Sequence, residues 1–352
     1  LYNKNNRVYS KLEMTLKQNK KVLVIRCGLL GDTVDATSVI DPLIEHFQNK
    51  VDIHWVTKPG ISELFKYDNR IQKIFELRHT RLPFYLNIDK QKIILNSIKS
   101  PYNLILNLEI GNKFNDIMKF SRATKKCGMP FQFVNDDIFE EHRVDHQLRI
   151  LELFIKDFRK EAAKPSIVGI NKKHLIHKFH LEEKYIVLCP TNSHVGKKNY
   201  RGYRSWPASN WKDLIEKILK LTDLKIYLVG SKDEMEYFSI FHPLPDRVYD
   251  ISGKTSIPEL ITILENSEVV VATDSGAVHL AGAVAKNIIS IHGPTNSHQS
   301  SPYQTYKNNV RIATLDLDCS PCYDTKIIKT CKKNICMHNL EASKIFNLIQ
   351  EF

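Results

Sequence analysis

A glycine turn near the start of the chain ends in an acidic residue that can serve as a base. The stretch Arg26-Cys-Gly-Leu-Leu-Gly-Asp32 lies between an apolar run and a helical pattern. Gly28 and Gly31 let the backbone turn tightly and let a ligand approach. The residues leave two interpretations of Asp32 open, a structural helix N-cap or a general base. As a carboxylate it is already ionised at pH 7 and can accept a proton from a hydroxyl group.

A second turn, in the other half of the chain, has the residues expected of a diphosphate site. A buried strand over residues 268–272 leads into Asp274-Ser-Gly276 and then into a helix that carries His279. We expect the free amides from Gly276 onward and the hydroxyl of Ser275 to bind a pyrophosphate. Asp274 would repel a phosphate, so it is assigned to capping or to sugar hydroxyls. His279 is interpreted as a packing or capping residue, or as a side chain that faces a cleft.

Two other strand ends and a basic loop are predicted to complete this anion site. Thr191 follows the strand expected at residues 185–189, and Gly293-Pro-Thr295 follows the one expected at 288–291. The loop from Gly196 to Arg204 is basic and contains glycine. A cationic loop above a phosphate site would neutralise the charge of a departing diphosphate. The alternative is an ordinary solvated basic loop.

Four of the seven cysteines lie close together near the C-terminus. Their spacing, Cys319-x2-Cys322-x8-Cys331-x4-Cys336, suits a tetrahedral thiolate site for iron or zinc. We expect a structural metal that holds a long loop before the last helix, with reduced thiols and disulfides as the alternatives. The remaining cysteines lie in apolar stretches and are expected to be buried free thiols: Cys27, Cys127 and Cys189.

Strands alternate with helices twice along the chain, which predicts two parallel-sheet α/β domains that face a central cleft. Strands are expected at residues 22–25, 52–57, 71–77, 102–107, 185–189, 225–229, 248–251, 268–272 and 288–291. Helices are expected at 32–48, 61–67, 91–100, 146–158, 206–221, 232–241, 257–266 and 276–286, and loops over 113–144. The predicted organisation is an extension (1–20), a first domain (21–160), a linker (161–184), a second domain (185–338) and a closing helix (339–352).

Composition and charge narrow the classes of protein and of partner. The chain of 352 residues carries 51 lysines and arginines against 39 acidic residues, a net charge of +12. This excess favours anionic partners such as phosphorylated small molecules or acidic lipid headgroups, or it is a solubilising surface. Nucleic acid is not expected, because no binding module is present. No apolar run reaches about 18 residues, so we expect a cytoplasmic protein without a membrane span. Residues 1–13, before Met14, are expected to be an extension foreign to the native protein.

Taken in order, these motifs resemble the family 9 glycosyltransferases, the bacterial heptosyltransferases. The resemblance runs from about Lys21 to the end of the chain and rests on motif order and spacing. It is carried by the first glycine turn and by Arg204-Ser-Trp-Pro207, Gly230-Ser-Lys-Asp-Glu234, Ser252-Gly-Lys-Thr255, Asp274-Ser-Gly-x-x-His279 and the cysteine cluster.

The resemblance implies a GT-B fold of two Rossmann-like, doubly wound domains, with the acceptor on the first and the nucleotide-sugar on the second. It implies transfer of heptose from ADP-heptose to a lipid-linked lipopolysaccharide inner-core acceptor, with inversion and without a catalytic metal. Contact with the cytoplasmic face of the inner membrane would be peripheral and electrostatic.

Roles carried over by the resemblance follow the matching positions. Asp32 matches the base that deprotonates the acceptor hydroxyl, with Gly28 and Gly31 beside it on the acceptor side. The positions matching the donor site are Thr191 and Arg204 at the phosphates, Glu234 at the ribose, and the turn of Asp274, Ser275, Gly276 and His279.

The motifs are also compatible with other functions. The acceptor is a protein or a capsule sugar in one alternative. In others the chain is a nucleotide-sugar epimerase, which turns over the donor without an acceptor, or a non-catalytic sugar-nucleotide sensor, which tolerates loss of Asp32.

Overall fold

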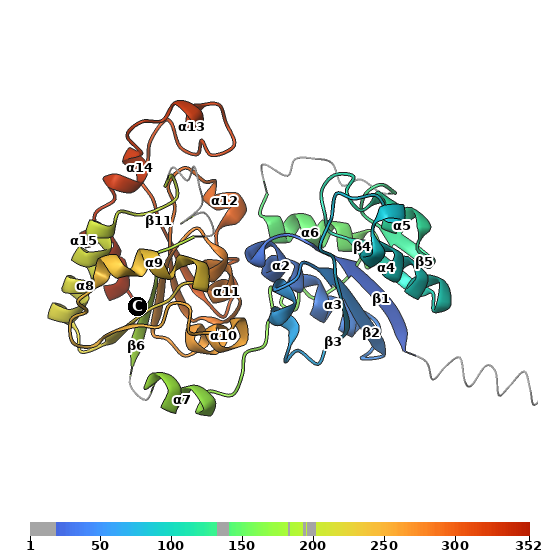
Figure 1. The fold of residues 1–352 in the computed structure, drawn as a ribbon, viewed down its shortest axis with the longest axis horizontal. Helices are drawn as coiled ribbons and strands as arrows, with labels where there is room; N and C mark the ends of the chain where they lie inside the picture. The colour runs from blue at the N-terminus through green and yellow to red at the C-terminus, as the bar shows by residue number, and fades with distance from the viewer. Residues whose placement is uncertain (1–18, 132–140, 182–183, 193–194, 196–201) are drawn as a thin grey trace, which may run out of the picture.

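The computed structural model describes residues 19–131, 141–181, 184–192, 195 and 202–352. These residues form two parallel sheets flanked by helices (Figure 1), which confirms the predicted fold class. The first half contains β1 Lys20–Ile25, α2 Leu30–Ala36, η1 Thr37–Val39, α3 Ile40–His46, β2 Val51–Thr57, η2 Ile61–Phe65, β3 Ile71–Glu76, η3 Phe84–Leu86, α4 Ile88–Lys99, β4 Tyr102–Asn107, α5 Asn115–Phe120, β5 Ala123–Cys127 and α6 Arg143–Glu152.

The second half begins with α7, which lies within the segment 161–184 that was expected to be an unpatterned linker. Its elements are α7 Lys173–Phe179, β6 Tyr185–Cys189, α8 Ala208–Leu221, β7 Lys225–Leu228, η4 Lys232–Glu234, α9 Met235–Phe238, η5 Ser239–Phe241, β8 Val248–Asp250, α10 Ile257–Glu265, β9 Val269–Thr273, α11 Gly276–Val284, β10 Asn287–Ile291, α12 Ser297–Ser300, β11 Asn309–Ala313, α13 Ile327–Thr330, α14 Ile335–His338 and α15 Ala342–Gln350.

Each glycine turn lies at the point where the strand order of its sheet reverses direction. The first sheet has the order β3-β2-β1-β4-β5 and the second β11-β10-β9-β6-β7-β8, all parallel. The first turn follows β1, beside β4, and the second follows β9, beside β6. Ligands of doubly wound sheets bind at such switch points, beyond the carboxyl ends of the strands.

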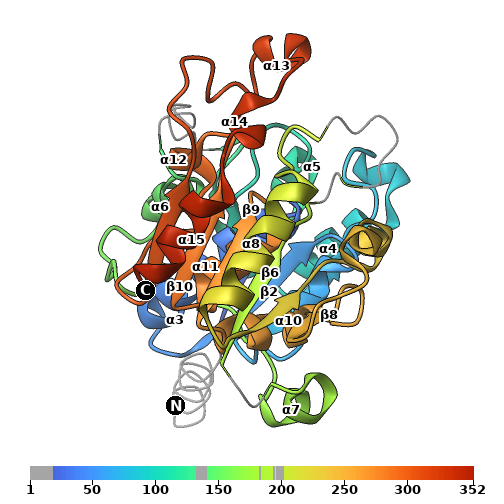
Figure 2. The same ribbon diagram turned by 90° about the vertical axis from the view of Figure 1, so that its left-hand side faces the viewer.

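Each sheet has one inner and one outer helical layer. α2, α3 and α6 pack on the inner face of the first sheet, and α10 and α11 on that of the second, within a single hydrophobic cluster. α4 and α5 cover the outer face of the first sheet. α8 and α15 cover that of the second (Figure 2). The two halves therefore meet through α2 and α11, whose residues contact one another.

Two strands lie where no strand was expected. β5 falls inside the region 113–144 that was predicted to be loops, which also contains α5, and β11 lies between the last predicted strand and the cysteine cluster. Both are edge strands, and their sequences, ATKKC and NVRIA, are not continuous apolar runs. An edge strand is half solvated, so it lacks the apolar run by which the central strands are recognised. The helix expected at 232–241 is divided into η4, α9 and η5.

Candidate active site

Asp32 lies at the third position of α2, where its carboxylate closes the start of the helix. The N-cap residue is Leu29, whose backbone N–H donates to Asp32 Oδ2 at 2.9 Å. The expectation that Asp32 is itself the N-cap is therefore wrong by three positions, although it does cap the helix. Gly28 is required here because a Cβ at that position would lie 2.7 Å from Asp32 Oδ2.

Two arginines surround the carboxylate of Asp32. Arg26 Nη2 lies 3.1 Å and Arg143 Nη1 3.4 Å from Asp32 Oδ1. Arg26 is in turn fixed by donating to the carbonyl of Leu108, which follows the neighbouring strand β4. Burial alone would raise the pKa of Asp32, but Arg26 and Arg143, together with the Leu29 N–H and His279, hold the pKa below its usual value. Asp32 is therefore ionised at neutral pH while 23% of its side chain remains exposed to a reactant.

Arg143 was not found from the sequence. It is the first residue of α6, a helix that was expected to begin three residues later, at 146. The N-cap is His142, whose Nδ1 accepts from the N–H of Val144. Histidine is not among the preferred N-cap residues, so the start of this helix carries no local signal. The contact of Arg143 with Asp32 also joins residues 111 positions apart.

The second turn presents an unsatisfied hydroxyl at the start of a helix. Ser275 is the N-cap of α11, yet its side chain makes no capping hydrogen bond. Its Oγ is buried and has no partner among the described residues. The first amides of α11, from Gly276 onward, have no acceptor within the helix. This arrangement can accommodate an anion that accepts from both the hydroxyl and the amides.

Asp274, next to Ser275, lies in a cationic surrounding. Arg204 Nη1 is 3.4 Å from Asp274 Oδ2. Burial would raise the pKa of Asp274, but His292, Arg204 and His279 together with a hydrogen bond from Thr295 lower it. Arg204 thus lies at the predicted phosphate turn, paired with a carboxylate.

The other residues predicted for the donor, Thr191 and Glu234, lie beyond the ends of the neighbouring strands β6 and β7. Thr191 Oγ1 donates to Glu234 Oε2 at 2.9 Å, and the N–H of Ser231 donates to the same oxygen at 2.7 Å. The hydroxyl of Thr273, at the end of β9, donates to the Thr191 carbonyl. Thr191 and Glu234 are therefore in contact and lie next to the Asp274 turn. Of the expected basic loop, residues 196–201 lie outside the described residues.

His279 points across to the first half of the chain. Its Nδ1 is 3.1 Å from Asp35 Oδ1 in α2, and both side chains are buried. A Cβ on Gly31 would lie 2.6 Å from the His279 ring, so the glycine permits this close contact. Asp35 was not singled out from the sequence, because its partner lies 244 positions away.

The cysteine segment packs against the donor-side turns. The N–H groups of Cys322 and Tyr323 donate to the carbonyl of Pro294, at the end of β10. The ring of Tyr323 lies 5.2 Å from the Arg204 guanidinium. All four cysteines are free thiols, as are Cys27, Cys127 and Cys189, which are buried as expected. Burial raises the pKa of Cys322, and the nearby Cys319 and Cys331 raise it further. In the described part of the chain, however, no three histidines, cysteines or carboxylates are placed to hold a metal ion.

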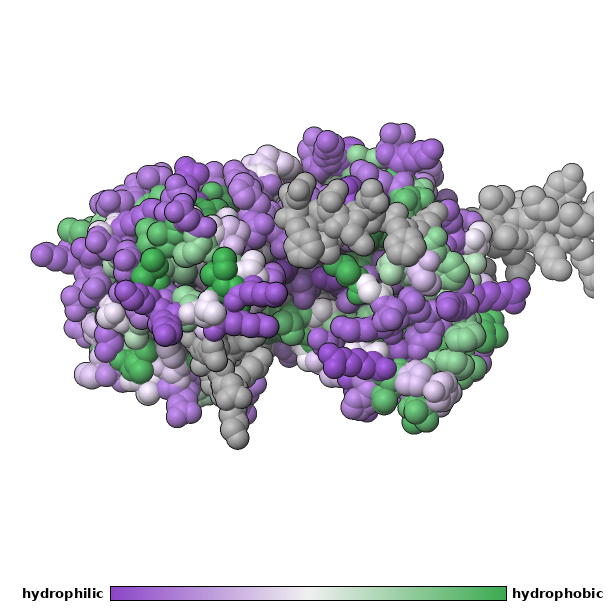
Figure 3. Space-filling view, turned by 90° about the horizontal axis from the view of Figure 1, so that it is seen from above, coloured by the Kyte–Doolittle hydropathy of each residue, from purple (hydrophilic) through white to green (hydrophobic). Residues whose placement is uncertain are grey.

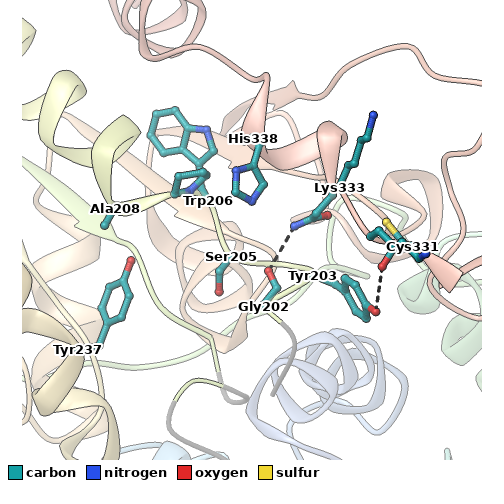
Figure 4. A pocket seen from close by; sticks show the side chains of 12 residues that line it. Gly202, Tyr203, Ser205, Trp206, Ala208, Tyr237, Cys331, Lys333 and His338 are labelled. Atoms are coloured by element: carbon teal, nitrogen blue, oxygen red, sulfur yellow. Dashed lines mark hydrogen bonds between the residues drawn. The ribbon is translucent and has the colours of Figure 1, made fainter. Parts of the chain in front are cut away.

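A pocket of about 530 Å³ opens between the cysteine segment and the start of α8. Tyr203 donates to the Cys331 carbonyl and Asn334 to that of Gly202, which joins the two walls (Figure 4). None of the predicted donor residues lines it. The pocket therefore borders the predicted site and is not its chemical centre.

Comparisons with known proteins agree on one family. The model of glycosyltransferase family 9 (heptosyltransferase) matches residues 119–332. The lipooligosaccharide heptosyltransferase 2 of Campylobacter jejuni serotype O:2 is 26% identical over 90% of this chain and 93% of its own length. A family 9 glycosyltransferase of Veillonella parvula has a TM-score of 0.73 at 15% identity, covering 95% of this chain and 98% of its own. The E. coli heptosyltransferase WaaC, solved with ADP-2-deoxy-2-fluoro heptose, has a TM-score of 0.67 at 14% identity, covering 94% and 99%.

No helix within the described ranges is long and apolar enough to cross a membrane.

Proposed function

The chain belongs to glycosyltransferase family 9, the heptosyltransferases, and on this premise we propose that it transfers heptose from ADP-heptose to a hydroxyl of a lipopolysaccharide inner-core acceptor. The proposal is supported above all by the contact between the two turns. A Cβ built on Gly276 would lie 3.2 Å from the side chain of Leu30, two residues before Asp32. The ionised carboxylate of Asp32 and the Ser275 hydroxyl, which has no partner among the described residues, thus lie on adjoining turns.

On the donor side, the diphosphate binds at the start of α11. The Ser275 hydroxyl and the amides from Gly276 onward donate to its oxygens. Arg204 turns from Asp274 toward the phosphates, which carry more charge than one carboxylate. Thr191 and Glu234 bind the adjoining phosphate and the ribose, and Asp274 and His279 support the turn.

On the acceptor side, Asp32 orients and deprotonates the attacking hydroxyl. The acceptor oxygen forms a bond to the anomeric carbon, the bond to the diphosphate oxygen breaks on the opposite face, and the proton passes to Asp32. Attack opposite the leaving group inverts the anomeric centre. ADP leaves with the bond electrons, and the donors at α11 together with Arg204 stabilise its charge. No cofactor is required for these steps.

The test is a donor and acceptor screen with the full chain. ADP-, UDP- and GDP-sugars are compared by calorimetry and then offered with a heptose-deficient inner-core lipid, a protein or a capsule oligosaccharide. We expect binding and transfer with ADP-heptose and the core lipid, and NMR of the product should show the inverted anomer. Transfer only to another acceptor overturns the acceptor assignment. Donor turnover without acceptor identifies an epimerase, and binding without turnover a sensor.

We also propose that the cysteine segment binds a structural iron or zinc, because its four thiols are near one another and free. The sulfurs would have to move together, since they are not placed as ligands in this structure. Elemental analysis of protein purified without chelator should find about one metal per chain, four thiolates being a complete ligand set. A content below about a tenth of that overturns this proposal and leaves the transfer reaction untouched.

A lipid-linked acceptor implies peripheral contact with the cytoplasmic face of the inner membrane. The net charge of +12 supports attraction to an anionic surface. Fractionation of cells should find the chain in the membrane pellet at low salt and released at high salt. Recovery in the supernatant at every ionic strength contradicts this.

A further inference from the structure

The outer surface of the first half carries a group of exposed apolar side chains. Tyr85, Leu86 and Ile88 are 66%, 63% and 67% exposed, respectively. Leu82, Leu95 and Ile98 are also exposed, at 40%, 54% and 51%. These six residues lie in the segment before η3, in η3 itself and along α4. Together they form what we call the α4 surface.

Helix α4 has two faces of different chemistry. Its inner face buries Ile93, Ile94 and Ser97 against the first sheet. On its outer face, Ile88, Lys92, Leu95 and Lys99 follow one another at intervals of four, three and four residues, and all are exposed. Apolar side chains and lysines therefore share the solvent side of α4, where the apolar groups can enter a membrane interface while the lysines meet anionic headgroups.

Positive charge surrounds the α4 surface. The exposed cations of this region take part in no ion pair among the described residues: Arg78, Arg81, Lys92, Lys99, Lys119 and Arg122. Two carboxylates lie nearby. Asp116 pairs with the buried Lys90 at 2.7 Å, whereas Asp89 accepts from the backbone N–H of Arg78 and keeps its negative charge, which the six cations outnumber. The surface is therefore complementary to an anionic partner.

The α4 surface lies on the face of the first half that points away from the second half. One end of it lies at the carboxyl edge of the first sheet. α4 and α5 form the layer opposite the contact between the halves (Figure 1). In the space-filling view, green hydrophobic residues are exposed on the part of the first half that lies away from the second half (Figure 3). The segment 78–87 leaves β3 at its carboxyl end. That is the same edge of the parallel sheet from which the Asp32 turn leaves β1.

We propose that the α4 surface binds an anionic lipid bilayer, with its apolar side chains in the interface and its lysines and arginines at the headgroup phosphates. This contact places the first half, which is proposed to bind the acceptor, against the membrane in which a lipid-linked acceptor lies. The inference deepens the proposed function, but vesicle binding can be measured without any sugar transfer.

The test is sedimentation of the full chain with vesicles. Vesicles of phosphatidylethanolamine with phosphatidylglycerol are compared with neutral phosphatidylcholine. The double variant K92E/K99E should bind the anionic vesicles at least about 25-fold more weakly, at about fivefold per lysine. L86S/I88S should also lose binding, and 0.5 M salt should weaken that of the wild type.

Matched controls lie on α8, on the far half of the molecule. Lys220 is exposed and Leu221 is 58% exposed. K220E/L221S should bind vesicles as the wild type does. All variants should transfer sugar to a short, water-soluble acceptor at the wild-type rate.

Two results overturn the proposal. One is equal vesicle binding by the wild type and both α4 variants. The other is a wild-type dimer that L86S/I88S converts to monomer without a change in vesicle binding, which would assign the surface to a second copy. If the wild type transfers no sugar to the soluble acceptor, the proposed function is contradicted. The vesicle-binding result then still decides whether the α4 surface binds lipid.

Discussion

Asp32 combines two features that a catalytic base needs and that are hard to obtain together. It is largely buried, which favours a fixed orientation, and it is ionised, because Arg26 and Arg143 lower its pKa against the effect of burial. A carboxylate with a pKa below 3.8 stays charged throughout the neutral range. Any loss of activity between pH 8 and pH 5 should therefore come from another group.

The variant Asp32→Asn tests whether this carboxylate acts as the base. Its amide keeps an oxygen for the Leu29 N–H but cannot take up the acceptor's proton. We expect kcat to fall by about 10²–10⁴-fold while the donor Kd changes by less than about twofold. Stopped assays and calorimetry measure the two effects. Glu45→Gln, which removes a surface carboxylate paired with Arg159, serves as the control. Turnover of Asp32→Asn within threefold of the wild type would show that Asp32 is only a cap.

We predict that Tyr323 positions Arg204, a role that the sequence did not indicate. Its backbone N–H is fixed to Pro294 and its ring lies 5.2 Å from the Arg204 guanidinium. Tyr323→Leu removes this cation–π contact, so the donor KM should rise about two- to fivefold with little change in kcat. Tyr323→Phe keeps the ring and should behave as the wild type. Equal KM values for Leu and Phe would rule out this role.

Site residues could be predicted from the sequence only where the contacts that define them are local. Asp32, Ser275 and Gly276 were recognised because a glycine turn between a strand and a helix is a local pattern. Arg143 and Asp35 were not, because their partners lie 111 and 244 positions away. A partner that is distant in the sequence produces no local sequence pattern around the residue that it contacts.

At the scale of elements, the same distinction holds for strands. The central strands Tyr102–Asn107 and Tyr185–Cys189 were predicted at their observed bounds, because they are apolar on both faces. The edge strands β5 and β11 were missed, since half of each is solvated. The fold class follows from the strands that were recognised, which include the edge strands β3 and β8, whereas β5 and β11 required the structure.

The contact between α2 and α11 makes a prediction about an element pair. Gly31→Ala places a methyl group against the His279 ring, so the helices must separate. We expect a loss of about 1–3 kcal/mol in the free energy of unfolding, measured with urea. The loss should be smaller when His279→Ala is already present, because the opposing ring is then absent. Additive effects in this double-mutant cycle would contradict a direct clash.

At the scale of the whole molecule, the two halves are joined by a buried pair that titrates. Burial would lower the pKa of His279, but Asp35 and, more weakly, Asp274 raise it above 6.5, against the opposing charge of Arg143. The raised pKa means that the pair's contribution to stability is complete below pH 6.5. It is lost as the pH rises through the folded-state pKa of His279.

The variant Asp35→Asn tests this link between the halves. The free energy of unfolding of the wild type should fall between pH 6 and pH 9, and the variant should lose most of that slope. At pH 6 the variant should be less stable by about 1–3 kcal/mol, because the charged hydrogen bond is lost and the buried His279 folds in its neutral form. Asp68→Asn, which breaks the Arg70 pair inside the first half, should keep the wild-type slope. The same slope in Asp35→Asn and the wild type would show that the pH dependence arises from another group.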